Sequence, residues 1–128
     1  MSEPVSEFKS KAGLGRILPA IGYGMAGLKA AWQNEHAFRQ EAVIGLILTI
    51  TALALPISAF QKMFLIAVLV LVMIVELINS AIEAIVDRIS LERHPLSKNA
   101  KDMGSAAVML SIFMASSCWI VVLFNRFY

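Results

Sequence analysis

The feature that most constrains this chain is the apolar run 103–124, which carries no charged side chain. About 20 such residues are enough for a helix to cross the roughly 30 Å of hydrocarbon in a bilayer. A second apolar run covers 37–55 and ends before Pro56, a residue that stops a helix. A third covers 63–86. None of these runs alternates as a barrel strand must, so the sequence predicts an all-α integral membrane protein with three transmembrane helices.

The composition supports a membrane protein and argues against other classes. Hydrophobic residues make up 59% of the 128 residues and charged residues only 16%, whereas a soluble domain has about 25% charged residues. The net charge of +2, without a dense Lys/Arg cluster, argues against a nucleic-acid partner. We therefore expect one membrane domain over residues 1–128, with no nucleic-acid partner.

Residues 1–36 precede the first span and are expected to form a tail and an amphipathic helix. The tail, up to about residue 12, should be loose, as chain termini usually are. Beyond it, apolar residues recur at three- and four-residue steps, the pattern of one helix face: Leu14, Ile17, Leu18, Ile21, Met25, Leu28 and Trp32. This segment has basic flanks and is too polar to span, so we expect it on the cytoplasmic membrane surface. Packing of the same face on the protein's own spans is an alternative that the sequence leaves open.

The basic residues indicate how the spans are oriented. Nine of the eleven Lys and Arg residues lie before or in the first turn of the first span, or in the segment 87–102, the expected loop between the second and third spans. Basic residues concentrate in the short loops on the cytoplasmic side of a membrane. We therefore expect the N-terminus and the 87–102 loop in the cytoplasm. After three spans, the C-terminus should then lie in the periplasm.

Four polar residues mark one face of the second span. Glu76, Asn79, Glu83 and Asp87 are three or four residues apart and fall within about 80° of arc on a helix. A carboxylate inside a span costs a few kcal/mol and usually faces protein or water. One interpretation is structural, with bonds to other helices or side chains that reach the interface. The other is functional, because hard oxygen ligands without His or Cys suit Mg²⁺, which takes one or two carboxylates together with phosphate oxygens.

A phosphate group would have to be bound near the cytoplasmic loop. The stretch "GYGMAG" has the G-x-G-x-x-G spacing but no strand before it, and the chain has no Walker-A loop. The loop itself supplies Lys98 and Lys101. Lys101 and Asp102 are expected to open the third helix, whose N-terminal amides favour an anion.

Other polar residues near this interface have more than one interpretation. Glu35 is either a further metal ligand or a solvated charge. Arg39 and Glu41 pair with each other or anchor a helix end. His94 fits a solvated loop residue better than a catalyst.

The residues "VELINSAIEAIVDRI", followed by "HPLSKNAKDMGSAAV", resemble the signature of the small bacterial integral-membrane diacylglycerol kinases. The stretch "AAWQNEHAFRQE" resembles the family's sequence ahead of its first span, and the likeness extends from about residue 15 to the end. The resemblance implies a homotrimer of three-span subunits in the bacterial inner membrane, with active sites shared between subunits. It also implies a lipid kinase that makes phosphatidic acid from diacylglycerol and MgATP, in phospholipid recycling.

The resemblance further implies roles for individual residues. Glu76 corresponds to the general base that activates the lipid's primary hydroxyl, Asn79 supports that site, and the Mg²⁺ ligands correspond to Glu35 and Glu83. Positions matching nucleotide contacts are Arg16, Tyr23, Glu35, Glu83, Asp87, Glu92, Arg93, His94, Lys101 and Asp102. Positions matching contacts with the lipid substrate are Arg16, Lys29, Ala30, Ala31, Trp32, Arg39, Gln40, Glu76 and Ser105.

Two alternatives stay open at this point. The related undecaprenol kinases share the core motif, although "AKDMGSAAV" and "NEHAFRQE" are closer to the diacylglycerol branch. A small proton-coupled transporter would also use a carboxylate embedded in the membrane. Such a transporter would need neither Lys101 and Asp102 nor Glu35, and it would work from an ion gradient without nucleotide.

Overall fold

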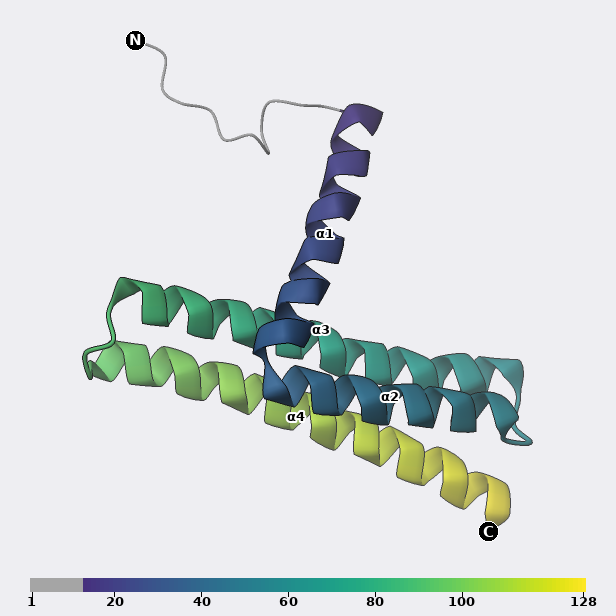
Figure 1. Cartoon of the computed structure of the whole chain (residues 1–128). Coiled ribbons are helices and arrows are strands. Elements are labelled where there is room, and N and C mark those ends of the chain that lie inside the picture. The colour runs from purple at the N-terminus through teal and green to yellow at the C-terminus, as the bar shows by residue number, and fades with distance from the viewer. Residues whose placement is uncertain (1–12) are drawn as a thin grey trace.

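A computed structural model describes residues 13–128 of the chain, so the tail up to residue 12 lies outside the described residues (Figure 1). The described part contains four helices and no strand, which confirms the all-α prediction. Three of the helices are long and apolar enough to cross a membrane. The helices are α1 (Leu14–Asn34), α2 (His36–Ala54), α3 (Ala59–Ile89) and α4 (Pro95–Phe127).

The α2 helix is the shortest of the three spans, and hydrogen bonds hold the turn that follows it. It ends at Ala54, two residues before Pro56, close to the end that the sequence predicts. The next helix begins with a capping box, in which the Oγ of Ser58 accepts from the backbone N–H of Gln61 at 3.1 Å and the Gln61 side chain accepts from the Ser58 N–H. The Nε of Arg126, at the end of α4, donates to the Pro56 carbonyl at 2.7 Å. This contact joins the end of α4 to the turn between α2 and α3.

The α3 and α4 helices extend well beyond the predicted spans. They contain 31 and 33 residues, or about 46 and 50 Å at 1.5 Å per residue, against a hydrocarbon thickness of roughly 30 Å. Most of the expected loop 87–102 is therefore helical, and the segment without helix is 90–94.

The start of α4 corrects one prediction from the sequence. Lys101 and Asp102 do not open this helix but lie inside it, because α4 already begins at Pro95. His94 is its N-cap, and the Nδ1 of that side chain accepts from the backbone N–H of Leu96 at 3.1 Å. Proline at the first helical position starts a helix readily, since its missing N–H would have no partner there.

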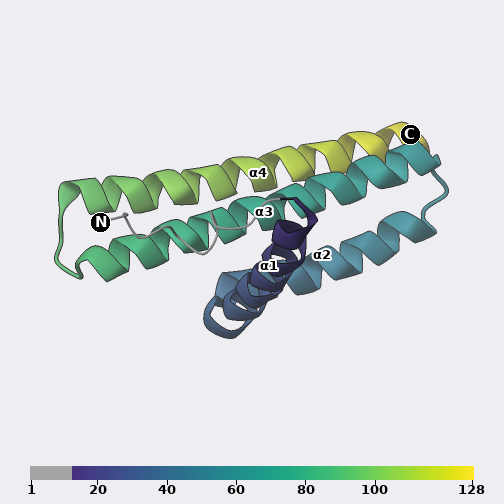
Figure 2. The ribbon, with the colours of Figure 1, turned by 90° about the horizontal axis from the view of Figure 1, so that it is seen from above.

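The α3 helix lies at the centre of the bundle, with α2 and α4 on either side (Figures 1 and 2). Its contacts with α4 run along most of its length, while α2 covers a part of it. In the described chain the backbones of α2 and α4 do not come close to each other. The core consists of Ala52, Leu65, Val68, Val72, Ala115, Trp119 and Val122. The far end of the α3–α4 pair, where 90–94 joins the two helices, extends beyond the start of α2 (Figure 1).

The α1 helix turns away from the bundle and runs across its direction (Figure 1). The bend is made at Glu35, whose extended backbone (φ −113°, ψ 108°) separates α1 from α2. The guanidinium of Arg39 donates to the carbonyls of Trp32 and Gln33, at 2.8 and 3.2 Å, and so caps the end of α1. Arg39 therefore anchors a helix end, which is one of the two interpretations left open by the sequence.

Candidate active site

The buried part of the polar face on α3 consists of Glu76 and Asn79. Glu76 is 4% exposed and Asn79 is 8% exposed, whereas the face as a whole becomes more open toward the 90–94 turn. Glu83 is half-buried and Asp87 is exposed. The face predicted from the sequence is thus graded, with a carboxylate buried in protein at one end and a carboxylate in contact with solvent at the other.

Asn79 is held between its neighbours on α3 and the backbone of α4. Its Nδ2 donates to the Oε1 of Glu83 at 3.4 Å, and its Oδ1 is buried without a hydrogen-bond partner among the described residues. Gly104 lies directly opposite, because a Cβ built there would overlap the Oδ1 of Asn79 and lie 3.3 Å from its Cγ. The absence of a side chain at Gly104 is what lets α4 approach this amide. Gly104 is not among the site residues predicted from the sequence, although a lone glycine inside a predicted span is a signal for close helix packing.

Glu41 on α2 is the second residue of the site that is not among those predicted from the sequence. Its carboxyl group lies within hydrogen-bonding reach of the Glu76 carboxyl group. The sequence interpretation allowed Glu41 to pair with Arg39, but the guanidinium of Arg39 is bonded to the end of α1 instead. The signal available in the sequence was a carboxylate inside the first predicted span.

Two further carboxylates lie around Glu76. Glu83 and Glu35 are close enough for their negative charges to act on it. Within one chain, then, the fold brings Glu35 from the α1–α2 bend toward the polar face of α3. These oxygen donors fit Mg²⁺, which needs one or two carboxylates and completes its shell with water and phosphate oxygens. Among residues 13–128 no group of three or more His, Cys, Asp or Glu side chains is arranged to hold a metal ion by itself.

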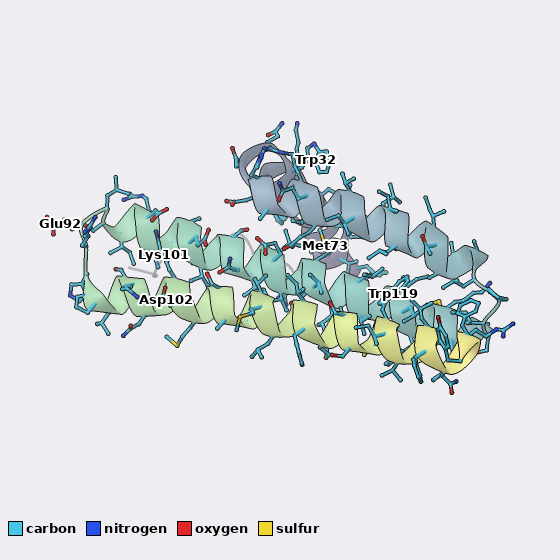
Figure 3. All side chains as sticks on the ribbon, turned by 90° about the horizontal axis from the view of Figure 1, so that it is seen from below. Trp32, Met73, Glu92, Lys101, Asp102 and Trp119 are labelled. Atoms are coloured by element: carbon cyan, nitrogen blue, oxygen red, sulfur yellow. The ribbon has the colours of Figure 1, made fainter. Side chains whose placement is uncertain are left out.

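An open hollow of about 790 Å³ lies at the end of the bundle where 90–94 joins α3 to α4. Across it, the Nζ of Lys101 is 2.7 Å from the Oδ1 of Asp87, while Asp102 pairs with Lys98 on its own helix. Figure 3 shows Glu92, Lys101 and Asp102 at this end, far from Trp119. Six of the residues matched to nucleotide contacts line the hollow: Asp87, Glu92, Arg93, His94, Lys101 and Asp102.

The remaining predicted residues are spread over other parts of the molecule. Arg16 and Tyr23 lie on α1 and do not line the hollow. Of the residues matched to the lipid substrate, most are exposed and lie along the second half of α1 or the first turns of α2; Figure 3 shows Trp32 there. Ala31, in the same part of α1, is buried. Ser105 is exposed on α4, next to Gly104.

A separate groove of about 400 Å³ runs along α3 between α2 and α4. Its walls are mostly apolar and include Leu48, Val72, Ile112 and Trp119. Glu41 is the charged residue of its lining. The groove follows from the packing described above, because the backbones of α2 and α4 both lie close to α3 but not to each other.

Comparison with known proteins gives the same assignment over nearly the whole chain. The family described as prokaryotic diacylglycerol kinase matches residues 22–123. A diacylglycerol kinase of Pseudomonas aeruginosa is 52% identical over 118 residues, covering 92% of this chain and 96% of the relative. One of Escherichia coli (strain K12) is 51% identical over 115 residues, covering 90% and 94%. One of Haemophilus influenzae is 40% identical over 112 residues, covering 88% and 95%. This chain therefore belongs to the prokaryotic diacylglycerol kinase family.

Proposed function

We propose that the chain transfers the γ-phosphate of ATP to the primary hydroxyl of diacylglycerol, which gives phosphatidic acid and serves phospholipid recycling. The observation that carries the proposal is the graded polar face of α3, which runs from buried Glu76 to exposed Asp87 at the hollow. The two carboxylates are eleven positions apart on the helix, or about 16 Å. A lipid hydroxyl and a water-soluble nucleotide can meet along such a face.

Glu76 is the general base of this proposal. It accepts the proton of the lipid hydroxyl while that oxygen bonds to the γ-phosphorus and the bond to the bridging oxygen breaks, so that ADP leaves. The base lies inside a span because the hydroxyl of diacylglycerol sits at the level of the lipid headgroups. Phosphoryl transfer depends mainly on positioning and charge neutralisation, and Asn79 with its bond to Glu83 helps to hold this part of the face in place.

The same proposal assigns the metal and the nucleotide to the outer part of the site. Glu35 and Glu83 would hold the Mg²⁺ that accompanies ATP. When bound, the ion neutralises negative charge on the phosphate oxygens. The residues lining the hollow would bind the nucleotide, with Lys101 as the cation nearest to the polar face through its pair with Asp87. Arg16 and Tyr23 would join them from α1.

We place the protein in the bacterial inner membrane with the N-terminus in the cytoplasm and the C-terminus in the periplasm. In this placement α1 lies on the cytoplasmic surface, which is supported by its direction across the bundle (Figure 1). The lipid contacts would then be Arg16, Lys29, Ala30, Ala31, Trp32, Arg39, Gln40, Glu76 and Ser105. We further propose a homotrimer with active sites shared between subunits, in keeping with the position of Arg16 and Tyr23 on α1, outside the hollow of their own chain.

The function is tested by incubating the purified protein with labelled ATP, Mg²⁺ and either diacylglycerol or undecaprenol in mixed micelles. We expect labelled phosphatidic acid as the main product, measured by thin-layer chromatography. Faster labelling of undecaprenol would place the chain with the undecaprenol kinases. Labelling of neither lipid, together with proton flux in vesicles without ATP, would favour the transporter and overturn the proposal.

The metal assignment predicts the behaviour of Glu83→Gln and Glu35→Gln. Each change removes one anionic ligand and keeps the shape of the side chain. We expect a raised Mg²⁺ requirement and an activity lower by at least about 10- to 100-fold, since the loss of a residue that only orients a metal ligand already has an effect of this size. The measurement is a Mg²⁺ titration of activity at fixed ATP for the parent and both variants. An unchanged Mg²⁺ requirement in both variants would contradict the assignment.

A further inference from the structure

Glu41 and Glu76 face each other across the α2–α3 contact. Glu41 takes part neither in the cap of α1 nor in the lining of the hollow. Their carboxyl groups lie within hydrogen-bonding reach. The Oε2 of Glu41 is buried and has no donor among the described residues. Two ionised carboxylates have four acceptor oxygens and no donor hydrogen. A hydrogen bond between the two side chains therefore requires one proton, carried by one member of the pair.

The other groups around Glu76 do not supply a donor to it. The amide Nδ2 of Asn79, three residues away on the same face, donates to Glu83. Arg39 is bonded to the carbonyls at the end of α1. Both nearby charges that act on Glu76, those of Glu83 and Glu35, are negative. Within the described chain Glu41 is thus placed to fix the orientation of the Glu76 side chain.

The position of Glu41 also relates the pair to the apolar groove. Glu41 lines the groove, together with Val72 and Met73, which precede Glu76 by about one turn of α3. A hydrocarbon chain lying in this groove would lead toward the two carboxyl groups. Glu41 therefore stands on the lipid side of Glu76, while Asn79 and Glu83 stand on the side of the hollow.

We propose that Glu41, in its neutral protonated form, is a positioning residue that donates a hydrogen bond to the Glu76 carboxylate and holds it toward the mouth of the groove. The proposal rests on the role of Glu76 as the base, because a base must be unprotonated and the shared proton then belongs to Glu41. Glu41 keeps this proton throughout the reaction, and the proton of the lipid hydroxyl goes to Glu76.

The test compares two substitutions that differ in the ability to donate. Glu41→Gln keeps an N–H donor of the same reach, whereas Glu41→Leu has a similar volume and no donor. We expect Glu41→Leu to lower kcat by about 10- to 100-fold, as a misplaced catalytic group does, with the KM for ATP within about twofold of the parent. Glu41→Gln should recover most of that loss. Thr49→Val is the matched control on α2, because the Thr49 hydroxyl bonds only to the Gly45 carbonyl of its own helix, and it should keep the parent kcat.

Three results separate this proposal from its rivals. A Glu41→Leu enzyme with the parent kcat would show that the pair does not position the base. A Glu41→Gln enzyme as inactive as Glu76→Gln would show that Glu41 itself accepts a proton, which overturns the neutral donor. Full activity of Glu76→Gln would instead show that Glu76 is not the general base, which contradicts the proposed function itself. Should Glu41→Leu fail to give the parent's elution profile in detergent, Glu41→Met, which is unbranched, takes its place in the same comparison.

Discussion

Glu76→Gln is expected to lower kcat by about 10²- to 10⁴-fold, the usual effect of removing a general base. Glutamine keeps the volume and the hydrogen-bonding reach of the side chain but cannot accept a proton from the lipid hydroxyl. Glu76 is 4% exposed, so little solvent is available to take over its role. The measurement is steady-state kcat with diacylglycerol at saturating MgATP.

The same variant should fold and assemble at least as well as the parent. Burying an ionised carboxylate is unfavourable, and a neutral amide of the same shape removes that cost. Its thermal stability and elution profile in detergent are the controls. If Glu76→Gln loses its fold while the surviving fraction turns over at the parent rate, Glu76 has a structural role and the base lies elsewhere.

Gly104→Ala is expected to lower activity severely through Asn79, although no catalytic group is changed. The new methyl group would overlap the Oδ1 of Asn79 and lie 3.3 Å from its Cγ and 3.9 Å from its Cα. Either the amide rotates away from Glu83 or α4 moves away from α3. Overpacking of this kind costs about 1–3 kcal/mol, and the displaced amide should lower kcat by about 100-fold, since small misplacements near a reaction centre have effects of this size.

A matched control for this prediction exists on α1. A Cβ at Gly27 would meet nothing within 4 Å, so Gly27→Ala should leave kcat unchanged and stabilise the helix slightly. The double variant Gly104→Ala/Asn79→Ala should regain the stability lost in Gly104→Ala, because the overlap is gone, but not its activity. An unchanged kcat in Gly104→Ala alone would show that the Asn79 amide is not needed in its observed position.

The sequence by itself determined the helical class, the three spans and the polar face that carries Glu76, Asn79, Glu83 and Asp87. These properties are local, because a backbone in lipid must bond within its own helix, and helical periodicity then decides which residues share a face. The sequence did not predict the lengths of α3 and α4. The polar composition of 87–102 favours a loop. The pattern of apolar residues does not predict whether a helix continues beyond the membrane surface.

The tertiary structure alone decided which residues meet across helices. Glu41 reaches Glu76 because α2 packs on α3, and the close approach of Gly104 to Asn79 depends on the packing of α4. The direction of α1 likewise depends on Arg39, seven residues after Trp32, closing back on the end of that helix. Contacts of this kind depend on how far apart two packed helices lie and how each is rotated about its axis. Both quantities are set by the side-chain ridges and small residues of the two helices together. A single helix carries only half of that information.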